Sequence, residues 1–131
     1  MNKASFEDHD IYLFLAMCWS GGGTFQLKDL IFAYDWVNRA VLTSQELEGA
    51  LNRLLSAGLV DATGNSYAVP KDIFDEFDAF RKRRRKDRFE VASAFVKRHE
   101  PLSNVEQKSN VEQRIRIPES TYRKAYDAYS R

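Results

Sequence analysis

Hydrophobic residues recur at helical spacing along the first sixty residues of the chain. Nine consecutive apolar residues from Ile11 to Trp19 predict a first helix that begins near Phe6 and ends before the glycines at 21–23. Because this helix is apolar on every side, it is expected at the centre of a core or under cover on two sides. The second side of this helix could be covered by another subunit or by the protein's own C-terminal part, and the sequence leaves both alternatives open.

Two further helices are indicated by stripes with the i, i+3, i+4, i+7 spacing. Thr24 is expected to cap the first of them, whose stripe consists of Leu27, Leu30, Ile31, Tyr34 and Val37. Thr43 and Glu46 have the spacing of a capping box, in which each side chain accepts a hydrogen bond from the other residue's backbone amide. The helix they begin is expected to end at Gly58, and its stripe consists of Leu47, Leu51, Leu54 and Leu55.

A β-hairpin is predicted directly after the third helix. Residues 59–62 and 66–69 have the composition of two short strands on either side of a turn at 63–65, and Pro70 stops the second strand. Residues 1–70 are therefore predicted to form a domain of three helices and a short hairpin.

The segment from Glu46 to Val60 resembles the third helix of winged helix-turn-helix proteins. In those families a leucine-spaced helix that ends in Gly-Leu-Val, as at 58–60 here, leads into the wing. The resemblance covers about residues 6–70, half of the chain, and no individual family is identified. It implies a winged helix-turn-helix domain whose third helix lies in the major groove of DNA, with the wing at the backbone or minor groove.

The resemblance places polar residues of the third helix opposite its leucine stripe, where they would meet DNA. Gln45 and Asn52 are candidates to bind adenine, and Arg53 is a candidate to bind guanine or a phosphate. The alternative is that these are ordinary polar residues of a solvated helix face. Charge weakens the first interpretation, because residues 1–70 contain four basic and eight acidic side chains, and none of residues 54–70 is Lys or Arg. A wing without positive charge cannot neutralise a phosphate.

Residues 71–131 are predicted to form a C-terminal helical extension. A long basic helix is expected over 72–98, with one apolar end from Ile73 to Phe80 and another from Phe89 to Val96. Its middle is expected in solvent and its two ends on different bodies. A linker is expected over 100–117, followed by a terminal helix over 119–130 whose tyrosines form a packing face.

The middle of this predicted helix carries seven basic residues in eight positions: Arg81, Lys82, Arg83, Arg84, Arg85, Lys86 and Arg88. One interpretation is a nucleic-acid clamp that supplies the phosphate contacts missing from the wing. A solvated connecting segment, partly paired by neighbouring carboxylates, is equally open, whereas a membrane-surface element is less favoured because the basic stretch has no apolar face.

Composition excludes several other classes of protein. The lone Cys18 allows neither an intramolecular disulfide nor a cysteine-based metal site. The longest apolar run is about half of what a membrane span needs. We therefore expect a cytoplasmic protein without membrane association. No catalytic motif, metal site or cofactor site is recognisable, so we expect no enzymatic activity and no cofactor.

Two functions follow as hypotheses. The first is a non-enzymatic, dimeric winged-helix module that binds duplex DNA and acts in transcription regulation. The second is a winged helix that mediates protein–protein interaction or dimerisation without binding DNA. The overall charge of +1 hides −4 in residues 1–70 and +5 in residues 71–131, which moves the expected DNA contact toward the basic run.

Overall fold

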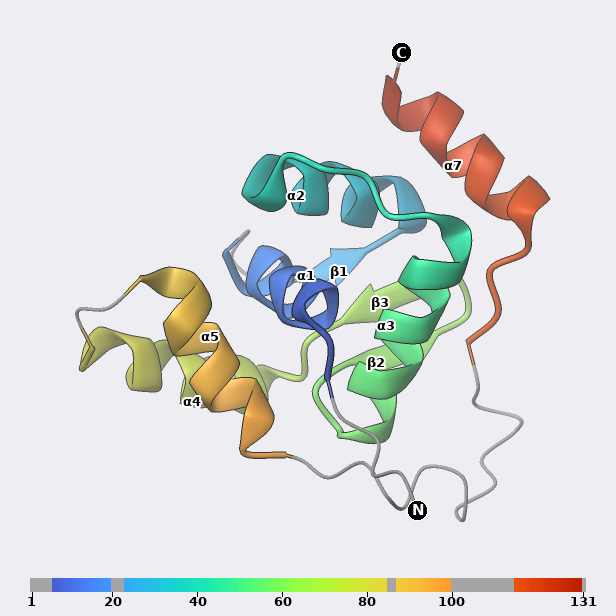
Figure 1. The fold of residues 1–131 in the computed structure, drawn as a ribbon. Helices are drawn as coiled ribbons and strands as arrows, with labels where there is room; N and C mark the ends of the chain where they lie inside the picture. The colour runs from blue at the N-terminus through green and yellow to red at the C-terminus, as the bar shows by residue number, and fades with distance from the viewer. Residues whose placement is uncertain (1–5, 20–22, 85–86, 100–114, 131) are drawn as a thin grey trace, which may run out of the picture.

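The computed structural model describes residues 6–19, 23–84, 87–99 and 115–130. It is mainly helical with a small antiparallel sheet, which confirms the predicted fold class at that level. The elements shown in Figure 1 are α1 (Asp8–Trp19), β1 (Thr24–Phe25), α2 (Leu27–Asn38), α3 (Ser44–Ser56), β2 (Asp61–Thr63), β3 (Ser66–Ala68), α4 (Lys71–Lys82), α5 (Arg88–Lys97) and α7 (Glu119–Ser130).

Helix α1 lies at the centre of the core, as its uniformly apolar sequence predicts. It packs against α2, α3 and α5, and side chains from Ile11 to Met17 are buried, apart from the half-buried Tyr12. Of the two covers left open by the sequence, the structure provides the protein's own C-terminal part, because α5 closes over α1 (Figure 1).

The start of α2 differs from the prediction. Thr24 does not cap the helix; it lies in β1, which pairs antiparallel with β3 in the register Thr24↔Ala68 and Phe25↔Tyr67. Helix α2 instead begins at Leu27 after Gln26, whose backbone amide donates to the Asp29 carboxylate at 3.0 Å. Pairing with a strand more than forty residues away requires an extended Thr24, and local spacing does not reveal such a partner.

Helix α3 begins and ends as predicted. The backbone amide of Glu46 donates to the Thr43 hydroxyl at 3.1 Å, and the amide of Thr43 donates to the Glu46 carboxylate at 2.9 Å. At the other end, Gly58 adopts a left-handed conformation with φ +78°. Its amide donates to the Leu55 carbonyl at 3.0 Å, and the next amide, of Leu59, donates to the Leu54 carbonyl at 2.9 Å. These two bonds form the Schellman motif, which satisfies the last carbonyls of the helix.

The predicted hairpin is present, with slightly shifted bounds. Strands β2 and β3 pair antiparallel from Asp61↔Ala68 to Thr63↔Ser66 around the two-residue turn at 64–65. The sheet order is β1-β3-β2, so β3 is the central strand.

The predicted continuous helix over 72–98 is wrong. The structure has two helices, α4 and α5, and Asp87 caps the second by accepting a hydrogen bond from the Phe89 amide at 2.9 Å. In a straight helix Phe77 and Phe95 would lie about 27 Å apart. In the structure their ring centroids are 5.1 Å apart, and both rings contact Phe14 of α1. The two apolar ends thus dock on the same core rather than on different bodies, because one turn allows both to be buried.

The terminal helix α7 matches its predicted bounds and packs against α2. Of the predicted linker, residues 100–114 lie outside the described residues. Residues 115–117 do not behave as a linker, because Ile115 and Ile117 are buried while Arg116 between them is exposed. Among the described residues, no helix has the combination of length and apolar character needed to cross a bilayer.

Candidate nucleic-acid interface and the outer face of α3

The three DNA-binding candidates on α3 have different surroundings. Gln45 is exposed on the first turn of the helix. Asn52 and Arg53 are only half-buried, but both side chains are engaged by other parts of the chain. The structure therefore leaves one of the three free to meet a ligand in this conformation.

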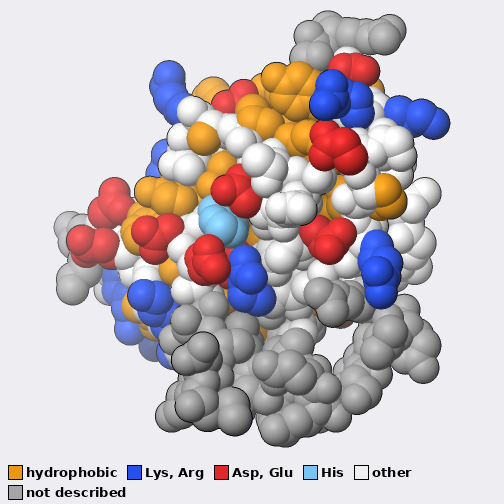
Figure 2. All heavy atoms as spheres, turned by 45° about the vertical axis from the view of Figure 1, so that its right-hand side comes forward, with side chains coloured by type: hydrophobic (Ala, Val, Ile, Leu, Met, Phe, Trp, Pro, Cys, Tyr) orange, Lys and Arg blue, Asp and Glu red, His pale blue; other side chains and the backbone are white. Residues whose placement is uncertain are grey.

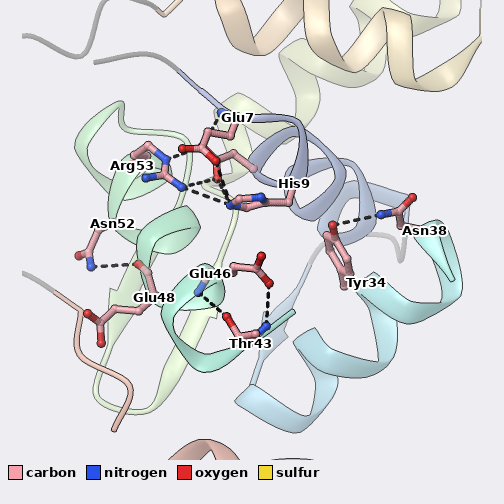
Figure 3. A network of polar contacts seen from close by, with 10 residues as sticks. Glu7, His9, Tyr34, Asn38, Thr43, Glu46, Glu48, Asn52 and Arg53 are labelled. Atoms are coloured by element: carbon pink, nitrogen blue, oxygen red, sulfur yellow. Dashed lines mark hydrogen bonds and ion pairs between the residues drawn. The ribbon is translucent and has the colours of Figure 1, made fainter. Parts of the chain in front are cut away.

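Arg53 binds the fully buried carboxylate of Asp10 on α1 with two hydrogen bonds. The distances are 2.5 Å from Nε to Oδ2 and 2.9 Å from Nη2 to Oδ1. The backbone amide of Glu7 also donates to Asp10 Oδ2 at 2.9 Å, and His9 Nε2 lies 3.4 Å from Arg53 Nη2 (Figure 3). Hydrogen bonding to Asp10 raises the pKa of Arg53 above its ordinary value. Arg53 thus ties α3 to the start of α1 and is unavailable to guanine or phosphate here.

Asn52 binds the main chain of the C-terminal segment. Its Nδ2 donates to the Ile115 carbonyl at 2.8 Å, and its Oδ1 accepts from the Ile115 amide at 2.7 Å. The same Nδ2 donates to the carbonyl of Glu48 at 3.0 Å, which holds the side chain in place (Figure 3). Both polar ends of the amide are satisfied, so Asn52 presents nothing to an adenine in this conformation.

Further contacts extend this docking along 117–122. Glu48 Oε1 accepts from the Ile117 amide at 2.6 Å. The Ser44 hydroxyl donates to Glu119 Oε1 at 2.8 Å, and the Tyr122 hydroxyl donates to the Leu42 carbonyl. The Ser44 bond, together with Arg123, lowers the pKa of Glu119, whereas burial raises the pKa of Tyr122. The side of α3 that carries Ser44, Glu48 and Asn52, called here the outer face, is therefore covered by polypeptide.

Sequence reasoning missed Asp10, Glu48 and Ser44 as contact residues. The alternation of Ile115, Arg116 and Ile117 signals an extended segment with one buried side. Nothing in the sequence says that this side lies on α3. Figure 2 shows the face of the molecule on which α3 and α7 lie, and acidic side chains are interspersed there with basic ones rather than forming a basic patch.

The basic run lies elsewhere, at the turn between α4 and α5. Arg85 and Lys86 lie outside the described residues. The five that are described are exposed: Arg81, Lys82, Arg83, Arg84 and Arg88. Figure 2 shows basic side chains at its lower left, below a group of acidic side chains, on the side where Figure 1 places α4 and α5.

Two of these residues share the single carboxylate of Asp78. Asp78 pairs with Arg81 at 2.7 Å and with Lys82 at 3.1 Å, and these partners lower the pKa of Asp78. Within the described ranges, no carboxylate forms an ion pair with Arg83, Arg84 or Arg88. Both interpretations of the run thus have support: part of it is paired, and three guanidinium groups keep their full charge.

Aromatic rings hold several of these guanidinium groups. Arg84 lies over the Phe80 ring, 3.5 Å from its centroid, and donates to the Phe80 carbonyl at 2.9 Å. Arg81 and Arg88 lie 5.7 and 4.9 Å from the centroid of Trp19, whose side chain is 46% exposed. Cation–π contacts of this kind position a guanidinium group without neutralising it, so the turn presents fixed positive charge.

The thiol of Cys18 is buried. Burial raises the pKa of the Cys18 thiol to about 12, so this thiol is not an activated nucleophile. The residues that the structure describes contain no group of three or more His, Cys, Asp or Glu side chains placed to hold a metal ion.

In comparisons with protein-family models, curated proteins and solved structures, nothing matched this chain. Its function is therefore inferred from its own residues and their geometry.

Proposed function

We propose that this chain is a non-enzymatic winged-helix protein that binds duplex DNA through the basic turn between α4 and α5. The order of α1, α2 and α3 followed by the β2–β3 hairpin agrees with the winged helix-turn-helix resemblance of the sequence. The observation that carries the DNA hypothesis is the exposure of Arg83, Arg84 and Arg88 without a carboxylate partner in the described ranges. Phosphate neutralisation by such groups supplies most of the affinity of sequence-independent DNA binding.

The proposed contact differs from the one that the resemblance implies. On α3, Arg53 is bound to Asp10, and Asn52 is bound to the main chain of Ile115. The hairpin supplies no positive charge, and Glu46 is exposed near the start of the helix. Binding through the α4–α5 turn needs neither α3 nor the hairpin, so we expect it to depend on salt rather than on base sequence.

Fluorescence anisotropy with a labelled duplex of random sequence tests this function. Affinity should fall steeply from about 50 to about 300 mM salt. Replacing Arg83, Arg84 and Arg88 by Gln should weaken binding at low salt at least tenfold and reduce the salt slope by about 3. The matched control replaces Lys28, Lys97 and Lys124 by Gln, because these exposed residues lie away from the turn and change the net charge equally. Absence of binding at the lowest salt would refute the function, and equal losses in the two variants would refute the site.

The second candidate function is a protein-interaction module that does not bind DNA. The specific observation in its favour is that the outer face of α3 already holds an extended polypeptide segment, at 115–117. If the chain has this function instead, the unmodified chain and both Gln variants should fail to bind DNA at any salt concentration.

A further inference from the structure

The docking of the C-terminal segment on α3 has the geometry of peptide recognition. The C-terminal arm, defined here as residues 115–130, consists of the extended residues 115–118 and helix α7. Figure 1 places α7 on the opposite side of the molecule from α4 and α5. The arm therefore does not extend the helical hairpin that precedes it; it binds a separate surface made by α3 and α2.

Two side chains of α3 form hydrogen bonds with main-chain groups of the arm. Asn52 bonds to both the amide and the carbonyl of Ile115, and Glu48 bonds to the amide of Ile117. Any residue in an extended conformation can offer its amide and carbonyl to Asn52 in this way. A residue inside a helix cannot, because the helix uses both groups in its own hydrogen bonds. The side chains of Asn52 and Glu48 thus select for backbone conformation.

The alternation of buried and exposed side chains along residues 115–117 determines which side chains the surface accepts. Ile115 and Ile117 are 6% and 4% exposed, whereas Arg116 points outward and is exposed. Pro118 follows, and its carbonyl accepts from the Tyr122 amide at 2.9 Å as α7 begins. The surface therefore accommodates two branched aliphatic side chains separated by one exposed residue.

We propose that the outer face of α3 is a peptide-binding site for an extended Ile-X-Ile segment. The chain's own arm is its occupant in this structure, and a partner polypeptide that carries this pattern takes its place when the arm is displaced. Because the site uses Asn52 and Glu48 rather than basic side chains, it is independent of the proposed DNA contact at the α4–α5 turn.

The arm has a large advantage over any external ligand. A tethered segment competes at an effective concentration in the millimolar range, so an external peptide reaches the site only weakly while the arm can dock. Disabling the arm within the full chain should therefore increase binding of the external peptide at least tenfold.

The test uses a fluorescein-labelled peptide with the sequence of residues 113–118 and the full-length chain. The acceptor carries Ile115→Asp and Ile117→Asp, which place charges at the two buried positions and prevent its own residues 115–117 from docking. We expect this acceptor to bind the peptide at least tenfold more tightly than the unmodified chain does. Adding Asn52→Ala should reduce binding at least tenfold, whereas adding Gln45→Ala, an exposed position on the same helix, should leave it unchanged. Failure of the acceptor to bind, equal binding of a scrambled peptide, or full binding after Asn52→Ala would each overturn the proposal.

A second measurement covers the case in which the double-aspartate chain does not fold. Hydrogen exchange at the amides of Ile115 and Ile117 can be followed in chains with Asn52→Ala or Gln45→Ala alone. Asn52→Ala should accelerate exchange at both amides at least tenfold while leaving the amides of α1 protected, and Gln45→Ala should not. Unchanged protection after Asn52→Ala would show that α3 does not hold the segment.

Discussion

Arg53 of α3 and Asp10 of α1 form a bidentate ion pair in which the carboxylate is completely buried. Arg53 is the only basic residue of α3. The resemblance to winged helix-turn-helix proteins makes it a candidate for DNA contact, yet the fold uses it to join two helices. The pair lies at the start of α1, where the Asp10 carboxylate also accepts the Glu7 amide.

Replacing Arg53 by Met should destabilise the protein more than replacing any other polar residue of α3. It leaves a buried carboxylate without its ionic partner, at a cost of about 3 kcal/mol. Asp10→Ala should cost less, because Arg53 is partly accessible and can turn to solvent. Urea unfolding followed by far-ultraviolet circular dichroism measures both, with Gln45→Met as the exposed control. A loss below about 0.5 kcal/mol for Arg53→Met would contradict the role assigned to the pair.

The ring cluster around Phe95 should couple α1, α4 and α5 into one cooperative unit. Phe95 is fully buried and its ring contacts Phe14, Phe77 and Phe80. Phe95→Ala should therefore lower the free energy of unfolding by about 3–5 kcal/mol. Phe32→Ala, at a position that is 57% exposed, is the control and should cost far less. A separate, earlier unfolding transition of the C-terminal helices would argue against a shared core.

Cys18 should be unreactive in the native protein. Burial raises the pKa of its thiol to about 12, so almost no thiolate forms near pH 8. We expect a colorimetric thiol reagent to modify Cys18 only after denaturant is added. Stoichiometric modification of the folded chain within minutes would show that the thiol is accessible.

Alkaline pH should weaken the docking of the C-terminal arm. The Tyr129 hydroxyl donates to Asp35 at 2.5 Å, and this bond raises the pKa of Tyr129. Burial raises the pKa of Tyr122. A raised phenol pKa means that the stabilisation is complete below the ordinary value of about 10 and is lost as the pH rises through the folded-state value. The difference in tyrosinate absorbance between the wild type and Tyr129→Phe should have its midpoint above about 10, and a midpoint at or below that value would contradict the Asp35 bond.

The cost of replacing Gly58 should be set by its backbone conformation rather than by steric contacts with its surroundings. A Cβ atom there would meet nothing within 4 Å, but φ is +78°. Gly58→Ala should cost about 1 kcal/mol through backbone strain alone. Gly58→Asn should cost less, because asparagine adopts the left-handed region more readily. Equal thermal midpoints for the glycine and alanine proteins would mean that the helix ends differently in solution.

Local features of the chain were predictable because neighbouring residues create them. The capping box of Thr43 and Glu46, the glycine that ends α3, and the β2–β3 hairpin each depend on residues within a few positions of one another. The central place of α1 follows from its uniform apolarity, since no orientation leaves a polar side for water. The described residues of the basic run are exposed because a segment with charged side chains on every side has no apolar face to bury.

Contacts between distant residues were not predictable, because many alternatives satisfy the same local pattern. Thr24 fits a helix cap equally well until β3 provides a strand partner. The pattern of residues 71–98 is compatible with one long helix. The structure has two helices because Phe77 and Phe95 both pack against Phe14. Asn52 and Arg53 have the chemistry to contact DNA, but in the folded chain they are bound to Ile115 and Asp10 instead. Short-range hydrogen bonding thus set the helices and the hairpin, whereas burial of apolar surface between remote segments set their arrangement and the partners of the α3 side chains.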